Sequence, residues 1–161
     1  MQPYPTSTQM PQPGTPPVPP SVANAVKAMY AGAAVTVVGV VIEILNANAT
    51  KAAIQKRSPH MPASQVASTQ HALVIGAIVG GLIAIAAWIF LARACRNGNA
   101  WARTTGTVFF ALATVDTIGS AVAPVAVAVK AFWPVIWLAG LTAVIFLWQR
   151  ASTAFFKGTS E

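Results

Sequence analysis

Two carboxylates lie inside long apolar stretches of the sequence. Glu43 stands near the end of the first stretch, and Asp116 stands about half way along the third, with no basic residue in the adjacent helical turns. An ionised aspartate at the centre of a bilayer costs on the order of 3 kcal/mol, so an acidic residue in such a place indicates a functional site by default. The chemistry open to the two groups is binding of a proton or cation, or a hydrogen bond that fixes the register of neighbouring helices.

Small residues accompany both carboxylates at helical spacing. Gly32, Thr36 and Gly39 fall on the face of Glu43, and Ala113, Gly119, Ser120 and Ala123 fall on the face of Asp116. Small residues let a second helix approach closely, so both faces are expected to meet protein rather than lipid.

The candidate polar site consists of Asp116, Glu43, Thr36 and Ser120, with Thr114 as a further hydrogen-bond partner for Asp116. For Glu43 a structural role is preferred, because a residue one turn from the interface can reach water. For Asp116 the transport role and the packing role are weighed equally.

Four apolar runs must hold these residues in place. They cover about residues 23–45, 71–91, 105–123 and 132–148. Each is long enough to cross a hydrocarbon layer of roughly 30 Å as a helix with its backbone groups paired internally. The composition agrees, since 55% of the chain is hydrophobic and 8% is charged. The sequence therefore predicts an all-α membrane protein, with four transmembrane helices in an antiparallel bundle and the first two helices extended beyond the membrane.

The segments outside these runs divide the chain into three parts. Residues 1–21 are proline-rich and are expected to form a disordered tail, residues 22–150 form the membrane domain, and residues 151–161 are a C-terminal tail. The external loop of residues 46–70 is alanine-rich at first and is then broken by Pro59 and Pro62, which predicts a helical hairpin that projects past the lipid.

PxxP spacings in the N-terminal tail match ligands of aromatic-lined adaptor grooves. Proline-rich segments match this pattern by composition alone, so a passive tail is preferred to an adaptor-binding one.

The second apolar run carries a ladder of small residues at intervals of four, namely Ala72, Gly76, Gly80 and Ala84. Such a face allows another helix to pack at close range, either within the bundle or across a homodimer. Packing within the bundle is preferred. Together with Gly32 and Gly39, these four positions are the predicted helix-packing residues.

The ten basic residues give a net charge of +7 but lie scattered at the ends of the runs. That distribution favours the headgroups of a lipid bilayer as the partner and argues against nucleic acid. Arg93, Arg96 and Arg103 are expected to form a lipid-facing basic hairpin. Six basic residues fall on the side of the N-terminus and four on the other side, so the positive-inside rule predicts a multi-pass protein of the cell membrane with both termini in the cytoplasm.

No catalytic, cofactor or metal motif occurs in the sequence. Two histidines and one cysteine, Cys95, make a poor metal site, and phosphate-binding loops, dinucleotide fingerprints and nucleophile elbows are absent. Trp88, Trp133 and Trp137 are assigned, like the other tryptophans, to the aromatic belts at the membrane interfaces rather than to a ligand box. The protein is therefore expected not to be an enzyme and to bind no cofactor.

Residues 86–103 (AAWIFLARACRNGNAWAR) and 107–112 (TVFFAL) resemble a pattern in uncharacterised actinobacterial four-helix membrane proteins. The resemblance extends to a proline-rich N-terminal tail, to residues 30–33 (YAGA) and to a polar loop before the second run. It covers most of the chain, and its most specific part is the hairpin of residues 97–103. The resemblance implies a four-helix fold and no particular activity.

Two functions agree with these features. The preferred hypothesis is a non-enzymatic structural, accessory or scaffolding protein, whose bundle anchors the tail and the external hairpin and binds a membrane-protein partner. The alternative is a small proton- or cation-coupled transporter that uses Asp116 and Glu43. Whether these two side chains share one cavity or point at separate packed contacts separates the two hypotheses.

Overall fold

The fold is all-helical over the residues that the computed structural model describes, which are 17–120 and 122–158 without the side chain of Ser120. The helices are α1 (Pro20–Leu45), α2 (Ala47–Arg57), α3 (Ala63–Arg96), α4 (Ala100–Ser120), α5 (Val127–Leu147) and α6 (Arg150–Gly158). No strand occurs in these residues, so the all-α prediction is confirmed. The predicted disordered tail lies almost wholly outside the described residues.

Three helices, α1, α3 and α5, are long and apolar enough to cross a membrane, and they support a membrane location. The fourth expected span, α4, has 21 residues but is less apolar, because it contains Arg103, Asp116 and several threonines. Length and composition therefore support three membrane-crossing helices in the described chain rather than the four predicted.

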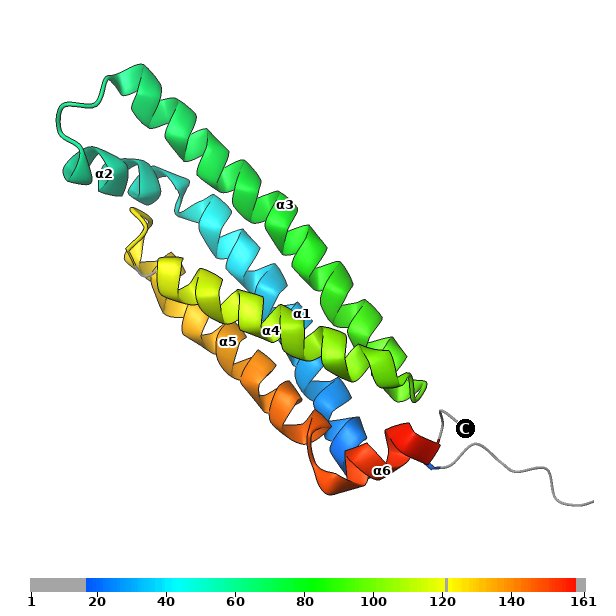
Figure 1. The fold of residues 1–161 in the computed structure, drawn as a ribbon. Coiled ribbons are helices and arrows are strands. Elements are labelled where there is room, and N and C mark those ends of the chain that lie inside the picture. Colours follow the sequence, from blue (N-terminus) through cyan, green and yellow to red (C-terminus); the bar gives the residue numbers. More distant parts are fainter. Residues whose placement is uncertain (1–16, 121, 159–161) are drawn as a thin grey trace, which may run out of the picture.

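Helix α1 is the centre of the bundle, since α3 and α5 both pack along it. Helix α4 leans on α5 and touches α3 mainly near the turn that joins them, so α3 and α4 diverge like the arms of a V (Figure 1). Gly98 permits this turn, because its φ of 76° lies in the left-handed region that favours glycine. The V leaves one face of α3 without a neighbouring helix over much of its length.

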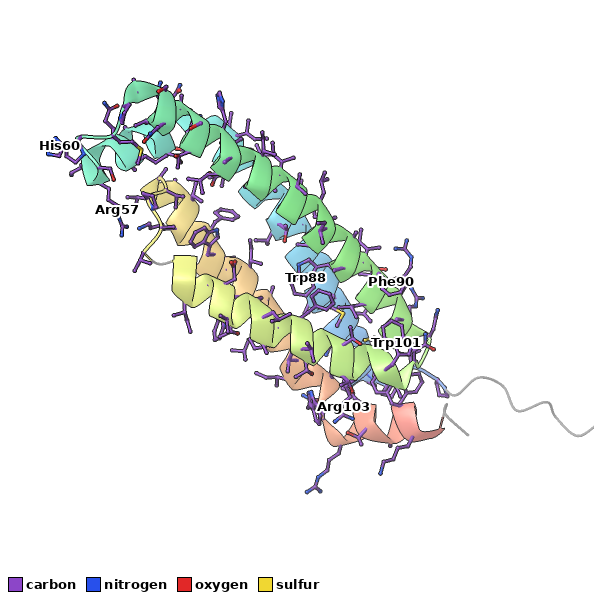
Figure 2. The ribbon with its side chains drawn as sticks, turned by 45° about the horizontal axis from the view of Figure 1, so that its top comes forward. Arg57, His60, Trp88, Phe90, Trp101 and Arg103 are labelled. Carbon is purple, nitrogen blue, oxygen red and sulfur yellow. The ribbon has the colours of Figure 1, made fainter. Side chains whose placement is uncertain are left out.

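The two ends of the bundle are packed differently. The α6 end carries α6 and the α3–α4 turn, with Trp101 and Arg103, while the α2 end carries Arg57 and His60 (Figure 2). Five helices contribute to a hydrophobic core at the α6 end, which includes Val22, Ala25, Met29, Leu91, Cys95, Ala102, Leu147, Phe155 and Phe156. The buried cluster at the α2 end is smaller and consists of Val125, Ala126 and Val129.

The expected continuation of the first helix is interrupted at Asn46. Its side-chain Nδ2 donates to the carbonyl oxygen of Ile42 at 2.9 Å, so a polar side chain competes with the helical backbone, and α2 starts as a separate helix. Helix α2 lies against the link between α4 and α5. Thr50 is fully buried there and its Oγ1 accepts a hydrogen bond from the backbone N–H of Ala126 at 3.3 Å. The hairpin is therefore packed against the rest of the bundle at this end, and its projection past the lipid stays a prediction.

Two later boundaries also differ from the expected ones. Helix α5 begins at Val127, before the apolar run predicted from residue 132, because Lys130 interrupts the hydrophobicity without interrupting the helix. Residues 151–158 of the expected C-terminal tail belong to α6, which buries Phe155 and Phe156 in the core and leaves Lys157 exposed. A nine-residue amphipathic helix is too short to stand out in a hydropathy window.

Candidate functional site

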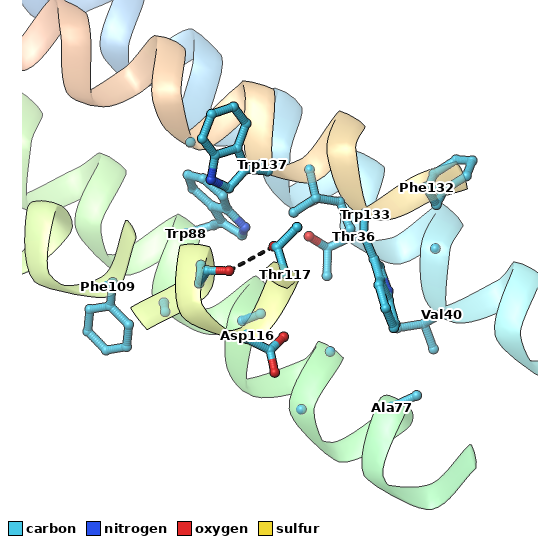
Figure 3. Close-up of a pocket in the computed structure, with 18 of the residues that line it drawn as sticks. Thr36, Val40, Ala77, Trp88, Phe109, Asp116, Thr117, Phe132, Trp133 and Trp137 are labelled. Atoms are coloured by element: carbon cyan, nitrogen blue, oxygen red, sulfur yellow. Dashed lines mark hydrogen bonds between the residues drawn. The ribbon is translucent and has the colours of Figure 1, made fainter. Parts of the chain in front are cut away.

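A cavity of about 800 Å³ lies between α1, α3, α4 and α5, in the opening of the V. Its walls are mainly small and aromatic side chains, as the close-up in Figure 3 shows. Glu43 from α1 and Asp116 from α4 both line it, and no lysine, arginine or histidine of the described chain does. The volume is within the range of roughly 300–1,000 Å³ that is typical of sites for small molecules.

Glu43 is buried in the wall of this cavity. Its exposed fraction is 5%, and it has no hydrogen-bond or ion-pair partner among the described residues. A buried carboxylate without a partner destabilises a fold, so efficient packing does not explain its position. The expectation that Glu43 simply reaches water at the helix end does not agree with this burial.

Asp116 reaches the same cavity from the opposite helix. Its side chain projects from α4 into the space beside α3 (Figure 3) and is accessible through the cavity. No described residue forms a hydrogen bond or ion pair with it. The structure thus brings together the two carboxylates that the sequence singled out.

Two threonines of the cavity wall direct their hydroxyl protons into their own helices. Thr36 Oγ1 donates to the carbonyl oxygen of Gly32 at 2.8 Å, and Thr117 Oγ1 donates to that of Ala113 at 2.7 Å (Figure 3). A hydroxyl has a single proton, so neither threonine has a proton left to donate to a ligand in the cavity.

The expected partners of Asp116 are engaged elsewhere. Thr114 Oγ1 donates to the carbonyl oxygen of Phe110 at 2.8 Å and accepts the indole N–H of Trp137 at 2.9 Å. Thr36 bonds within its own helix, and the Ser120 side chain lies outside the described residues. Both carboxylates of the predicted polar site line the cavity, and neither Thr36 nor Thr114 forms the predicted hydrogen bond with them.

Sequence reasoning missed the aromatic part of the site. Trp88, Trp133 and Trp137, which were expected in interfacial belts, line the cavity together with Phe109, Phe110 and Phe132. One signal was available, because Trp133 and Trp137 are four residues apart and so fall on one helical face. That signal identifies a face but not the empty space in front of it.

The small residues of α3 face the cavity instead of a packed helix. Ala72, Gly76, Gly80 and Ala84 line it, and a Cβ atom at Gly76 or Gly80 would meet nothing within 4 Å. The preferred prediction of internal packing on this ladder is wrong, because the contact between α1 and α3 is made one residue later, where Val40 lies against Gly81.

The small residues of α1 are used for close packing as expected. A Cβ atom at Gly32 would lie 2.9 Å from Cζ2 of Trp88, and one at Gly39 would lie 3.5 Å from Cδ1 of Phe132. Because both glycines lack a Cβ atom, aromatic rings can pack directly against α1 at these positions.

The basic hairpin is only partly exposed. Arg93 and Arg96 are at the surface, but the Arg103 guanidinium stacks on the Trp148 ring at 3.8 Å from its centroid, and its Nη1 donates to Thr153 Oγ1 at 3.0 Å. Arg103 is therefore a packing residue of the α6 end and not a lipid-facing one, because Trp148 and α6 cover it.

The arrangement is a cavity with two carboxylates in a mainly apolar and aromatic wall. No group of three or more His, Cys, Asp or Glu residues in the described chain is placed to hold a metal ion. The fold and the cavity define the chain as an all-α protein with apolar helices long enough to cross a membrane and with acidic groups between them. Comparisons with protein-family models, with curated proteins and with solved structures find no match to this chain.

Proposed function

We propose that this protein is a small transporter of the cell membrane that binds a cation in its cavity and couples cation movement to proton movement. The observation that carries the proposal is that Glu43 and Asp116, from two different helices, line one cavity that no basic side chain of the described chain enters. A packed anchor is expected to pair such groups within the bundle, whereas a cation site leaves them open to the ligand.

In this proposal α4 is the fourth membrane-crossing helix. Most of its polar side chains bond inside the protein: Thr107 accepts the indole N–H of Trp148 at 3.0 Å and donates to the carbonyl of Arg103 at 2.9 Å. Such bonds lower the cost of placing polar residues in lipid. Four spans return the chain to the starting side, so both termini are cytoplasmic, in agreement with the distribution of basic residues.

The test is transport by the purified protein in liposomes that contain a pH-sensitive dye. Sodium, potassium and tetraethylammonium are added outside in turn, and at least one is expected to drive proton movement that empty liposomes lack. Asp116→Asn is expected to lower the rate at least tenfold. Glu161→Gln, which removes the third acidic residue of the sequence, is the matched control and should transport normally. Absence of cation-dependent proton movement with all three cations would reject the proposal.

One observation favours an accessory role as a second candidate. The open face of α3 at Gly76 and Gly80 has the small residues that a transmembrane helix of a partner needs for close approach. In that case a transmembrane helix of the partner occupies the cavity, and the protein is a scaffold without transport activity.

Copurification in mild detergent distinguishes this second candidate. A stoichiometric membrane-protein partner is expected with the wild type and is expected to be lost with Gly80→Leu, which fills the open face. Ala86→Leu, on an exposed position of the same helix outside the cavity, is the control. A clean protein without any partner, or a partner retained by Gly80→Leu, would count against the accessory role.

A further inference from the structure

We infer that the cavity takes a hydrophobic organic cation, a molecule with a bulky apolar body and a permanent or delocalised positive charge. The inference rests on the proposed cation-binding function and adds the chemical class of the cation. It depends on the hydrogen-bonding character of the cavity wall, on its aromatic rings and on its opening.

The polar groups of the wall whose bonding is defined are acceptors. Glu43 and Asp116 have no partners among the described residues, and Thr36 and Thr117 donate their protons to carbonyl groups of their own helices. The N–H of Trp137 is bonded to Thr114. An anion would find few donors here, whereas a cation meets two carboxylates.

The rest of the wall is apolar and aromatic. Trp88 from α3, Phe110 from α4 and Trp133 and Trp137 from α5 place rings around the same space. Phe110 and Trp137 pack with their ring centroids 5.5 Å apart, and the hydrogen bond from Trp137 to Thr114 holds the indole in place. Aromatic faces attract cations, most strongly where water is excluded, and they also accommodate apolar groups.

A bare metal ion does not fit this wall. Hard cations take six or more oxygen ligands, and a metal site of three or more acidic, histidine or cysteine side chains is absent from the described residues. An organic cation has a weakly held hydration shell and apolar groups that the rings can cover. It therefore exploits both the carboxylates and the rings, while an inorganic ion exploits only the carboxylates.

The shape of the bundle gives such a molecule a route of entry. The cavity lies in the opening of the V, where α4 stays apart from α3, and the α3 wall there includes the small residues Ala72, Gly76, Gly80 and Ala84. A hydrophobic cation that has partitioned into the membrane can enter sideways between the two helices.

The test compares two ions of the same shape and opposite charge. Tetraphenylphosphonium and tetraphenylborate are titrated into the full-length protein in detergent, and quenching of tryptophan fluorescence is measured, because three tryptophans line the cavity. Saturable quenching is expected with the cation alone. Glu43→Gln and Asp116→Asn are each expected to weaken binding at least tenfold, and Glu161→Gln is expected to bind as the wild type does.

Circular dichroism and gel filtration show which variants keep the fold, and Gly76→Trp, which fills the open wall without replacing a carboxylate, provides an independent block of the site. Equal binding of the two ions, or wild-type binding by Glu43→Gln, Asp116→Asn and Gly76→Trp, would overturn the inference. Cation binding without proton movement in liposomes would leave this inference standing and reject transport. Proton movement driven by sodium without tetraphenylphosphonium binding would support transport and reject the inference that the cavity takes a hydrophobic organic cation.

Discussion

The α6 end and the cavity treat polar side chains in opposite ways. At the α6 end the hydroxyls of Ser21 and Ser152 are hydrogen-bonded at 2.8 Å, and Arg103 stacks on Trp148. In the cavity, Glu43 and Asp116 have no partner among the described residues. The same chain thus pairs these polar side chains where five helices meet, although Nε of Arg103 has no partner among the described residues, and leaves two carboxylates open where α3 and α4 separate. The contrast agrees with the proposal that the open carboxylates serve binding rather than stability.

The largest expected effect is on packing of the α6 end. Leu147 is fully buried there, so Leu147→Ala should lower the free energy of unfolding by about 2–5 kcal/mol, through lost contacts and an unfilled cavity. Leu82→Ala, at a side chain that is 62% exposed, should have a much smaller effect. Unfolding of both variants in SDS mixed micelles, followed by circular dichroism, measures the difference. Equal losses would mean that the two regions are not packed differently.

A second pair of variants compares two glycines of the bundle. A Cβ atom at Gly140 would lie 2.8 Å from Cδ2 of Phe110, whereas one at Gly76 would meet nothing within 4 Å. Gly140→Val should therefore cost about 1–3 kcal/mol of stability by overpacking, and Gly76→Val should cost little. The same unfolding assay applies, and a large loss in Gly76→Val would show that its face is packed.

A smaller effect is expected from the stacked arginine. Arg103→Lys keeps the charge but loses the planar stacking on Trp148 and the defined bond to Thr153, which should cost about 1 kcal/mol. Arg93→Lys, at an exposed position in the last turn of α3, is the control and should leave the unfolding midpoint unchanged. If Arg103→Lys also left it unchanged, the α6 end would not depend on its polar contacts.

The smallest effect on stability is expected at the cavity itself. Asp116→Asn removes a charge that no described residue pairs with, so the stability of the protein should stay the same or rise slightly. Thermal unfolding of the two proteins in the same detergent provides the measurement. A loss as large as that of Arg103→Lys would reveal a structural partner for Asp116 and would remove the contrast between the two regions.

The sequence was sufficient to predict the long helices. The apolar runs of α1, α3 and α5 exceed the length of a bilayer crossing, and Pro59 and Pro62 break the chain between α2 and α3, because these signals depend on residues close together in the chain. The position of α6 was missed, since its two phenylalanines gain their burial only from contacts with other helices.

The sequence singled out the two acidic residues that line the cavity but not the residues that surround them. Gly80 and Gly81 are neighbours of the same type, yet Gly81 meets Val40 and Gly80 meets open space. The rotation of α3 about its own axis relative to α1 determines which of the two glycines faces α1, and no local sequence pattern encodes that rotation. The role of Trp133 was missed for the same reason, since a belt position and a cavity position have the same sequence signature.

The turn at Gly98 also provides a pivot about which α4 can tilt as a rigid body. Because α4 meets α3 mainly near this pivot, the displacement of any α4 residue in a swing of the helix grows with its distance from Gly98. Asp116 is far along the arm, at about 27 Å for a rise of roughly 1.5 Å per residue, so a tilt of a few degrees would move its carboxylate by an ångström or two. Widening the gap between the helices and withdrawing the acidic group from the opposite wall are then one and the same movement.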